Sequence, residues 1–478
     1  MQKIKFIDRK RELEFLENLW KEKGFKLVII FGRRRVGKTE LIKKFQENKK
    51  HIYYLCDKGG TERNALRFAR IASFLFGDVP PSVEYGFENV FSYIKNRIGK
   101  EKIVITLDEF AYLIEKDSAI PSIFQRIVDE ILKDTEIMLI LCGSSMGMMY
   151  EHTLSAKSPL YGRKKGFWEV KPLSFRDVCK FFPSLKIEEI IKIFSVFGNI
   201  PSYLKEVDVK LSLEENVKEK IMRKGSPLYR EPEILLLEEF KEPGPYQNIL
   251  EAMSREATLS KIASKANLEA KDLPKYLKKL IQLSLVRREY PVTEKKGKTK
   301  KSLYFINDNL FFFWYKFCSR NLSFLEEGRE EFVFKKYVKD NLPHVFAKGF
   351  EEVCRELVTF RFPVFERTGR WWRHVRDETG KRNTEEIDIL ALNEKAKEIL
   401  LAECRWQRKV NARKICKELA EKSQYVRWHN DKRRESFAIF AKSFSKRISE
   451  FEGRKVYCFD LKDMEKMALS NTGMMIDK

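Results

Sequence analysis

The residues with the clearest chemical meaning form a glycine-rich segment near the N-terminus. The segment Gly32-Arg-Arg-Arg-Val-Gly-Lys-Thr39 has the spacing GxxxxGK[ST], and it lies between an apolar run at 27–31 and an amphipathic stretch at 40–47. Backbone N–H groups of such a loop and the positive end of the following helix can surround phosphate oxygens. Lys38 would neutralise the β- and γ-phosphates, and Thr39 would bind Mg²⁺ through its hydroxyl. The other residues expected to line a nucleotide here are Gly32, Arg33, Arg35, Val36, Gly37 and Glu40.

Two carboxylates follow a second apolar run. Ile103–Leu107 is continuous apolar sequence apart from one threonine, and Asp108 and Glu109 come directly after it. Asp108 would hold Mg²⁺, and Glu109 would orient or activate an attacking water. An ordinary acidic helix cap is the alternative interpretation. It is weakened by the phosphate loop, whose strand we expect to lie next to this one.

Short apolar runs alternate with amphipathic stretches over the first 170 residues. Such runs suit parallel strands that are buried on both faces, so we expect a three-layer α/β fold. The four runs are 27–31, 52–56, 103–107 and 137–142. The last one leads into Gly143-Ser-Ser145, and Ser145 or Ser144 could contact the γ-phosphate or the water. A plain Gly-Ser turn is the alternative.

The pattern changes after residue 170. Residues 171–241 are predicted to be helical, and Glu242-Pro-Gly-Pro245 then interrupts the chain. Between 242 and 320, three helical stretches precede two strand-like runs that flank a lysine-rich tip at 294–301, an order typical of a winged helix-turn-helix. The third helical stretch, 271–283, would be the recognition helix. Its lysines favour phosphate contacts with little base specificity; a solvated face that serves protein contacts is the alternative.

The overall charge favours a polyanionic partner. Lys and Arg number 94 against 70 Asp and Glu, for a net charge of +24, which points to DNA ahead of an anionic membrane. A heat-tolerant surface rich in Lys and Glu is the alternative. Hydrophobic residues make up 43%, which excludes a wholly disordered chain. The sequence contains no run of about 18 apolar residues, so no membrane-spanning helix is predicted. The eight cysteines lack metal-binding spacing, so we expect reduced thiols, no zinc and a cytoplasmic protein.

Several of these motifs together resemble the archaeal ATPase family, which belongs to the AAA+/STAND group of P-loop NTPases. The resemblance rests on Phe6–Leu13, the phosphate loop, Leu107–Phe110 and Cys142–Met146. It implies an ATP-hydrolysing core with an AAA+-like parallel sheet at 1–170 and a helical lid at 171–241.

The resemblance also implies roles for residues outside the phosphate loop. Phe6 and Arg9 would lie against the adenine, and Pro201 would pack near it. Arg163 matches a candidate γ-phosphate sensor or finger. The alternatives are that Arg163 pairs with surface acids and that Pro201 only ends a helix.

Residues 321–478 resemble the domain that accompanies this family, an α/β unit like the PD-(D/E)XK restriction endonucleases. Asp388 and Glu403 would be its metal-binding acids on neighbouring strands, with Glu352 or Glu351 as the third. Arg405 stands where the family has a lysine, and Lys409 could substitute for it. Because arginine cannot readily act as a base, a nuclease-like fold without cleavage activity is the alternative.

Three functions remain open at this point. The first is a Mg²⁺-dependent ATPase coupled to DNA binding. The second is a metal-dependent nuclease regulated by ATP. The third is a nucleotide-gated assembly protein without DNA. The sequence is compatible with a homo-oligomer and does not fix the oligomeric state.

Overall fold

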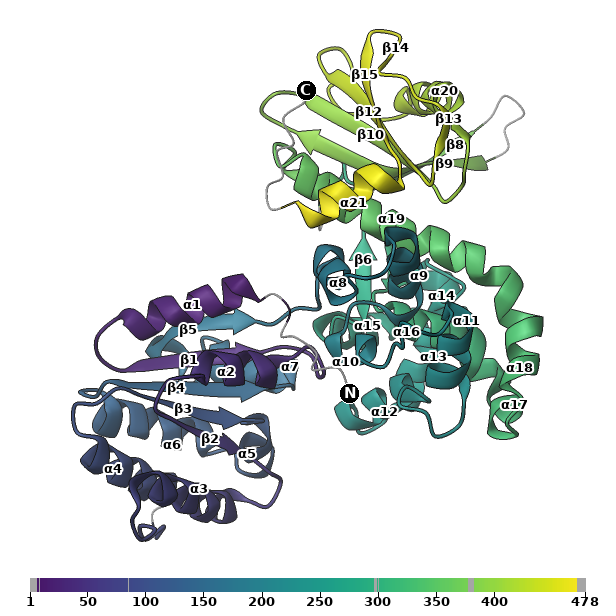
Figure 1. Cartoon of the computed structure of the whole chain (residues 1–478). Helices are drawn as coiled ribbons and strands as arrows, with labels where there is room; N and C mark the ends of the chain where they lie inside the picture. The colour runs from purple at the N-terminus through teal and green to yellow at the C-terminus, as the bar shows by residue number, and fades with distance from the viewer. Residues whose placement is uncertain are drawn as a thin grey trace. The chain divides into compact units, whose positions relative to one another are not determined.

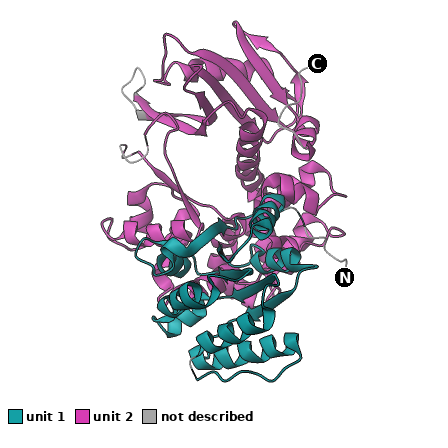
Figure 2. Ribbon diagram, turned by 90° about the vertical axis from the view of Figure 1, so that its left-hand side faces the viewer, with its two compact units in different colours: residues 1–172 teal, residues 173–478 magenta. Residues whose placement is uncertain are grey.

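The computed structural model describes residues 7, 9–84, 86–295, 299, 301–376 and 382–470. The chain forms two compact units, residues 1–172 and 173–478, coloured teal and magenta in Figure 2. We call them unit 1 and unit 2. The segments expected at 171–241, 242–320 and 321–478 thus fall almost entirely within unit 2.

Unit 1 is built on a five-stranded sheet in which all neighbouring strands run parallel. Its strands are β1 (Lys26–Phe31), β2 (His51–Leu55), β3 (Ile103–Asp108), β4 (Ile137–Gly143) and β5 (Lys164–Glu169). Every residue of β1, β3 and β4 is buried, because helices cover both faces of the sheet (Figure 1). The expected parallel α/β sheet is therefore confirmed.

The helices of unit 1 follow from amphipathic sequence between the strands. They are α1 (Lys10–Lys21), α2 (Lys38–Gln46), α3 (Thr61–Phe76), α4 (Phe87–Ile98), α5 (Ala111–Lys116), α6 (Ile120–Arg126) and α7 (Met146–Met149). A cluster of aromatic rings that includes Phe68, Phe91 and Phe124 fills the space between the sheet and the helices α3, α4 and α6. This core fixes the strand ends on which the candidate site stands.

The strand order differs from one expectation. The order is β2-β3-β4-β1-β5, so β4 lies between β1 and β3. The strand that carries Asp108 is therefore not the neighbour of the phosphate-loop strand. The chain crosses over after β3 and inserts β4 between the two, which brings the end of β4 to the same edge of the sheet.

Unit 2 begins with helices. These are α8 (Phe175–Phe181), α9 (Ile187–Phe197), α10 (Pro201–Leu204), α11 (Leu213–Asn216) and α12 (Glu231–Glu239). Three further helices then precede an antiparallel strand pair, in the order expected from the sequence: α13 (Gly244–Met253), α14 (Leu259–Lys265), α15 (Leu273–Gln282), β6 (Val286–Glu289) and β7 (Leu303–Ile306). Half of the lysine-rich tip between β6 and β7, namely residues 296–298 and 300, lies outside the described residues.

A helical segment joins this part to the C-terminal sheet. It contains α16 (Asn309–Phe313), α17 (Leu322–Glu326), α18 (Glu330–Val333) and the long α19 (Leu342–Arg361). The aromatic residues Phe311, Trp314 and Tyr315 are fully buried here. Helix α19 also packs closely against α9: a Cβ on Gly349 would lie 2.0 Å from the Ser195 hydroxyl. Helices α9 and α19 thus tie the first and last parts of unit 2 together.

The C-terminal sheet has the order β14-β15-β12-β10-β9-β8. Strands β8, β9 and β10 are successively antiparallel, whereas β10, β12 and β15 run parallel. The elements are β8 (Arg367–Arg376), β9 (Arg382–Asn393), β10 (Glu398–Arg405), β11 (Val410–Asn411), α20 (Ala412–Ser423), β12 (Arg434–Ala441), β13 (Phe444–Lys446), β14 (Glu450–Phe451), β15 (Arg454–Phe459) and α21 (Leu461–Leu469). Within the described ranges, no helix combines the length and apolar composition needed to cross a membrane.

Candidate nucleotide and metal site

The phosphate loop connects β1 to α2, as its sequence requires. Gly32 has a φ of +154°, and a Cβ there would lie 2.4 Å from the Val170 carbonyl oxygen, so no larger residue fits. Gly37 has a φ of +94° and caps the N-terminus of α2. Both glycines are therefore needed to turn the loop tightly over the start of the helix.

Lys38 lies inside this loop and has only neutral acceptors. Its Nζ donates to the carbonyl oxygens of Gly32 at 2.9 Å and Arg33 at 3.2 Å. The residue is 6% exposed, and no carboxylate of the described residues forms an ion pair with it. A buried ammonium held only by carbonyls gains most from a charged acceptor such as a phosphate oxygen.

The remaining residues of the loop region are also placed. Arg33 and Val36 are buried, Arg35 has a φ of +68°, and Glu40 is exposed on the first turn of α2. Arg9 donates to the Val36 carbonyl at 2.7 Å and thereby ties the start of α1 to the loop.

Asp108 and Thr39 come together at the end of β3. The Thr39 hydroxyl donates to Asp108 Oδ2 at 2.8 Å, and Asp108 is 1% exposed. The Tyr53 hydroxyl donates to the same oxygen at 2.5 Å. Burial raises the pKa of the Tyr53 hydroxyl, and the hydrogen bond to Asp108 raises it further. Sequence reasoning missed Tyr53; the signal was a tyrosine in an apolar strand, whose hydroxyl needs a polar partner.

Glu109 is held by the end of β4. Its Oε2 accepts from the Ser144 N–H at 3.2 Å and from the Ser144 hydroxyl at 2.8 Å. Glu109 itself has a φ of +53°. Of the two serines considered, Ser144 makes this contact, whereas Ser145 stands at the N-terminus of α7 and makes no side-chain capping bond. The insertion of β4 between β1 and β3 is what brings Ser144 to Glu109.

Two other expected residues have different surroundings. Arg163 forms a two-pronged ion pair with Asp129, with N–O distances of 2.6 to 2.9 Å, and donates to the Pro159 carbonyl. Its hydrogen bond lowers the pKa of Asp129. The sequence analysis gave such pairing with a surface acid as the alternative to a γ-phosphate sensor. Pro201 is the first residue of α10 in unit 2. Phe6 lies outside the described residues.

A second group of acids gathers in unit 2, where the middle of β9 lies beside the end of β10. Asp388 accepts from the Cys404 N–H at 2.8 Å. Glu403 is 3% exposed and lies 3.0 Å from the Arg405 guanidinium and 3.3 Å from the Lys422 ammonium. Burial raises the pKa of Glu403 to about 7, with Asp388 adding to the effect.

The third acid beside this pair is Glu351, not Glu352. Burial and Asp388 raise the pKa of Glu351 to about 7, and Arg370 lies 2.5 Å from its carboxylate. Glu352 instead accepts from Arg287 of β6 at 2.8 Å. Neighbouring residues on a helix point about 100° apart, so only one of the two can face the sheet end.

Lys422 of α20, rather than Lys409, supplies an ammonium to this group. Lys409 donates its backbone N–H to the Ser443 hydroxyl, and its side chain forms no ion pair with any described carboxylate. Arg405 pairs with both Glu403 and Glu418. Among the described residues, no three His, Cys, Asp or Glu side chains are arranged to hold a metal ion. The expected set of Glu352, Asp388 and Glu403 is therefore not assembled.

Comparisons with known proteins can now be set beside this geometry. Residues 6–207 match a family described as an ATPase domain predominantly from Archaea, and residues 314–415 match a family of archaeal and bacterial proteins of unknown function. An uncharacterized protein of Methanocaldococcus jannaschii is 38% identical over 464 residues, which cover 96% of this chain and 99% of that protein. An uncharacterized ATP-binding protein of the same organism is 64% identical over 47 residues, or 10% of this chain and 80% of that protein.

Two solved structures are also similar. The Walker-type ATPase PABY2304 of Pyrococcus abyssi has a TM-score of 0.45 and 20% identity, covering 64% of this chain and 95% of that one. The Aeropyrum pernix ORC1 protein in complex with DNA has a TM-score of 0.33 and 13% identity, covering 70% of this chain and 94% of that one. The near full-length relative and the match over the phosphate-loop unit agree with the site described above: the chain belongs to the archaeal ATPase family.

Proposed function

We propose that the chain binds ATP together with Mg²⁺ and hydrolyses it at the phosphate-loop site. The observation that carries this proposal is the contact between Thr39 and Asp108 at the mouth of a loop whose Lys38 has only neutral acceptors. A charged lysine, a hydroxyl and a buried carboxylate are in this way brought together without neutralising one another.

The residues present fit a magnesium–triphosphate. Mg²⁺ prefers oxygen ligands, and the Thr39 hydroxyl and the Asp108 carboxylate are two oxygens 2.8 Å apart. Lys38 can exchange its two carbonyl acceptors for phosphate oxygens, and no buried ion pair has to be broken for this exchange. When bound, Mg²⁺ would shield the negative charge that builds up during phosphoryl transfer.

Glu109 is the residue we propose to activate the attacking water. Glu109 follows Asp108 in the chain, and within the described part of the chain its carboxylate accepts hydrogen bonds only from Ser144. The Ser144 hydroxyl and N–H hold the Glu109 carboxylate in place without an ion pair. Release of one Ser144 bond would free a lone pair for the water proton.

The Mg²⁺ dependence of Thr39→Ala tests this assignment. We expect wild-type phosphate release from ATP to require Mg²⁺, and Thr39→Ala to retain ATP binding in EDTA but to lose Mg²⁺ stimulation. Ser155→Ala, a hydroxyl removal on the surface of unit 1, is the control and should behave as wild type. Full Mg²⁺ stimulation in Thr39→Ala would rule out its proposed role as a metal ligand.

We further propose that unit 2 binds DNA and couples it to the ATPase. On α15, Lys278 and Lys279 are exposed and no described carboxylate forms an ion pair with them, whereas Lys275 contacts Asp272. Turnover measured with and without duplex DNA tests the coupling: we expect stimulation, and affinity that falls steeply with salt. No binding even at low salt would favour a nucleotide-gated assembly protein.

A second candidate function is metal-dependent cleavage of nucleic acid by unit 2. It is favoured by two acids on neighbouring strands: Asp388 of β9 accepts from the Cys404 N–H at 2.8 Å, and the adjacent Glu403 of β10 is 3% exposed. Plasmid incubated with Mg²⁺ or Mn²⁺ tests it. Asp388→Asn should abolish cleavage, whereas the exposed Asp431→Asn should not; equal cleavage by all three proteins would exclude this site.

A further inference from the structure

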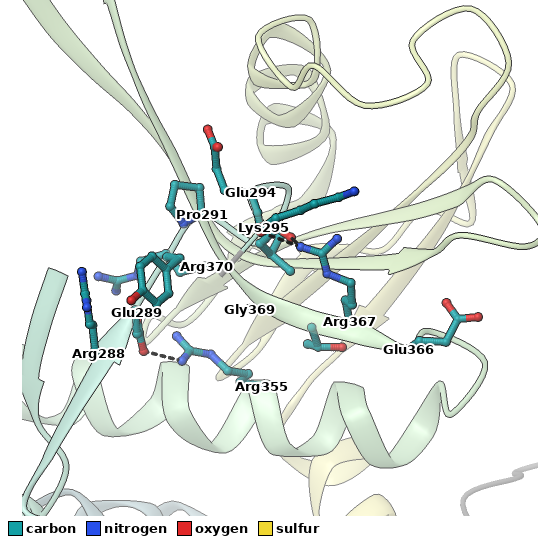
Figure 3. Close-up of a pocket in the computed structure, with 13 residues that line it drawn as sticks. Arg288, Glu289, Pro291, Glu294, Lys295, Arg355, Glu366, Arg367, Gly369 and Arg370 are labelled. Carbon is teal, nitrogen blue, oxygen red and sulfur yellow. Dashed lines mark hydrogen bonds and ion pairs between the residues drawn. The ribbon is translucent and has the colours of Figure 1, made fainter. Parts of the chain in front are cut away.

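A pocket of about 540 Å³ whose lining includes several charged side chains lies within unit 2, between the chain that follows β6, helix α19 and the start of β8 (Figure 3). We call it the wing pocket; its walls are residues 288–292 and 294–295, Arg355, and residues 366–370. No site described above includes it.

The walls of the wing pocket are fixed to the C-terminal sheet. The Val292 N–H donates to the Arg370 carbonyl at 3.0 Å, and Val292 shares the hydrophobic core of Trp371. Arg367 donates to the carbonyl oxygens of Val292 and Glu294. The chain after β6 is thereby held along the edge strand β8, so the pocket does not depend on the tip of the β6–β7 pair.

Most acidic groups of the pocket are already neutralised. Five basic and three acidic side chains line it. Glu289 forms ion pairs with both Arg355 and Arg287. Burial alone would raise the pKa of Glu289, but the two guanidinium groups lower it to about 2. Glu294 pairs with Lys301. Arg355, Arg367 and Arg370 also pair with carboxylates, so among the described residues Arg288 and Lys295 are the pocket cations that no carboxylate pairs with.

Three donors of the wing pocket have no acceptor among the described residues. Arg288 is exposed, stacks on Tyr290 and Tyr304 at 4.8 and 5.3 Å, and forms no ion pair there. Lys295 forms none either. The Nε of Arg355 is buried and donates to no acceptor of the described chain. A buried N–H without an acceptor is unfavourable, and a bound anion would supply the missing acceptor.

The wing pocket adjoins the acid group of unit 2. Arg370 lines the pocket, lies 2.5 Å from Glu351 and lies 3.0 Å from Glu386. Arg355 and Arg370 also line a second cavity of about 360 Å³ that contains Glu351. An anionic chain in the wing pocket would therefore contact Arg370, whose guanidinium also pairs with the candidate acid Glu351.

We propose that the wing pocket binds the phosphodiester backbone of a nucleic-acid strand. Guanidinium and ammonium groups are the usual partners of phosphate oxygens. The unpaired donors come from β6, from the chain after it and from α19, which suits a ligand that is charged at several points along its length. This inference rests on the nucleic-acid binding proposed for unit 2, and it names where the backbone lies.

The test compares two double variants of the full chain. Arg288→Ala/Lys295→Ala removes the two exposed donors, and neither has an ion pair to lose. Arg70→Ala/Lys100→Ala removes one arginine and one lysine from exposed positions of unit 1 that form no ion pair with any described carboxylate. Binding of a fluorescent 20-nucleotide single strand and of its duplex is measured by anisotropy over a salt series. We expect the pocket variant to bind at least about tenfold more weakly, with a salt slope smaller by about 1.5.

The control variant should bind as wild type does. Equal affinities and slopes for the two double variants would overturn the wing-pocket proposal while leaving binding by unit 2 intact. No binding by the wild-type chain would overturn the proposed DNA function itself. A nucleoside monophosphate that competes as strongly as the 20-nucleotide strand would also overturn the proposal, because the site would then hold a small anion.

A third variant probes the buried donor. Arg355→Lys retains a cation for Glu289 but removes the Nε–H, so we expect weaker strand binding with a thermal midpoint close to that of the wild type. Unchanged binding in this variant, beside a loss in Arg288→Ala/Lys295→Ala, would remove Arg355 from the set of contacts and overturn that part of the proposal.

Discussion

The phosphate-loop site of unit 1 and the acidic residues around α19 of unit 2 contain the same kinds of side chain, held by different partners. Lys38, Asp108 and Glu109 are bonded to carbonyls, hydroxyls and backbone N–H groups. Around α19, Glu351 is paired with Arg370, and Glu352 with Arg287. Both regions contain partly buried carboxylates, so the partners set them apart.

The difference indicates which charges are available to a ligand. A charge held by neutral groups keeps its attraction for an incoming ion, whereas a charge held by an opposite charge has already been neutralised. We therefore expect substitutions in the first region to change activity more than stability, and substitutions in the second to change stability more than activity. The following predictions test that contrast, from the largest effect to the smallest.

Lys38→Ala should have the largest effect on activity. We expect loss of ATP binding and a fall in turnover on the order of 10³-fold or more, because a charge-assisted contact to the phosphates is removed. The thermal midpoint without nucleotide should change little. Lys44→Ala, an exposed change on the same helix, is the control. Strong destabilisation by Lys38→Ala would contradict the expectation that substitutions in the phosphate-loop site change activity more than stability.

Glu289→Gln should have the largest effect on stability. It leaves Arg287 and Arg355 without their shared carboxylate, and breaking such a buried pair costs about 3–5 kcal/mol. Denaturant unfolding measures it, with Glu327→Gln as an exposed control that should cost less than about 1 kcal/mol. A loss below 1 kcal/mol for Glu289→Gln would show that the network around α19 is not structural.

The same residue predicts a dependence on pH. The pKa of Glu289 is about 2 in the folded chain against an ordinary value of 4.5, so its contribution to stability is present above about pH 4.5 and is lost as the pH falls towards 2. The wild-type unfolding free energy should therefore decrease over that window more than that of Glu289→Gln. Parallel pH curves for the two proteins would contradict the assigned pairing.

Glu109→Gln should keep nucleotide binding and reduce turnover on the order of 10²-fold, because the amide cannot accept the proton of the water. Binding is measured with a fluorescent nucleotide and turnover by phosphate release. Turnover equal to wild type would remove Glu109 from the mechanism and leave the attacking water without a base at this site.

Tyr53→Phe should have the smallest effect. Loss of one hydrogen bond to Asp108 is worth about 0.5–1.5 kcal/mol, so the Mg²⁺ concentration for half-maximal turnover should rise about threefold to tenfold. Turnover at saturating Mg²⁺ should stay near wild type. The exposed Tyr161→Phe is the matched control. A fall in saturated turnover without a shift in Mg²⁺ dependence would show that Tyr53 does not act through Asp108.

The sequence by itself determined the phosphate loop, Lys38, Thr39 and Asp108, and the parallel sheet beneath them. These features are local: a contiguous motif sets the loop, and apolar runs set strands whose ends are known. Asp388 and Glu403 came instead from the resemblance to a nuclease-like domain, and their strands, β9 and β10, do pair in the sheet.

Only the tertiary structure decided which distant residues complete each site. Ser144 reaches Glu109 because β4 is inserted between β1 and β3, and Tyr53 reaches Asp108 because β2 pairs with β3. The rotation of α19 selects Glu351 over Glu352, and the packing of α20 brings Lys422 rather than Lys409 to Glu403. Strand order and helix rotation follow from the packing of the whole core, which no short stretch of sequence contains.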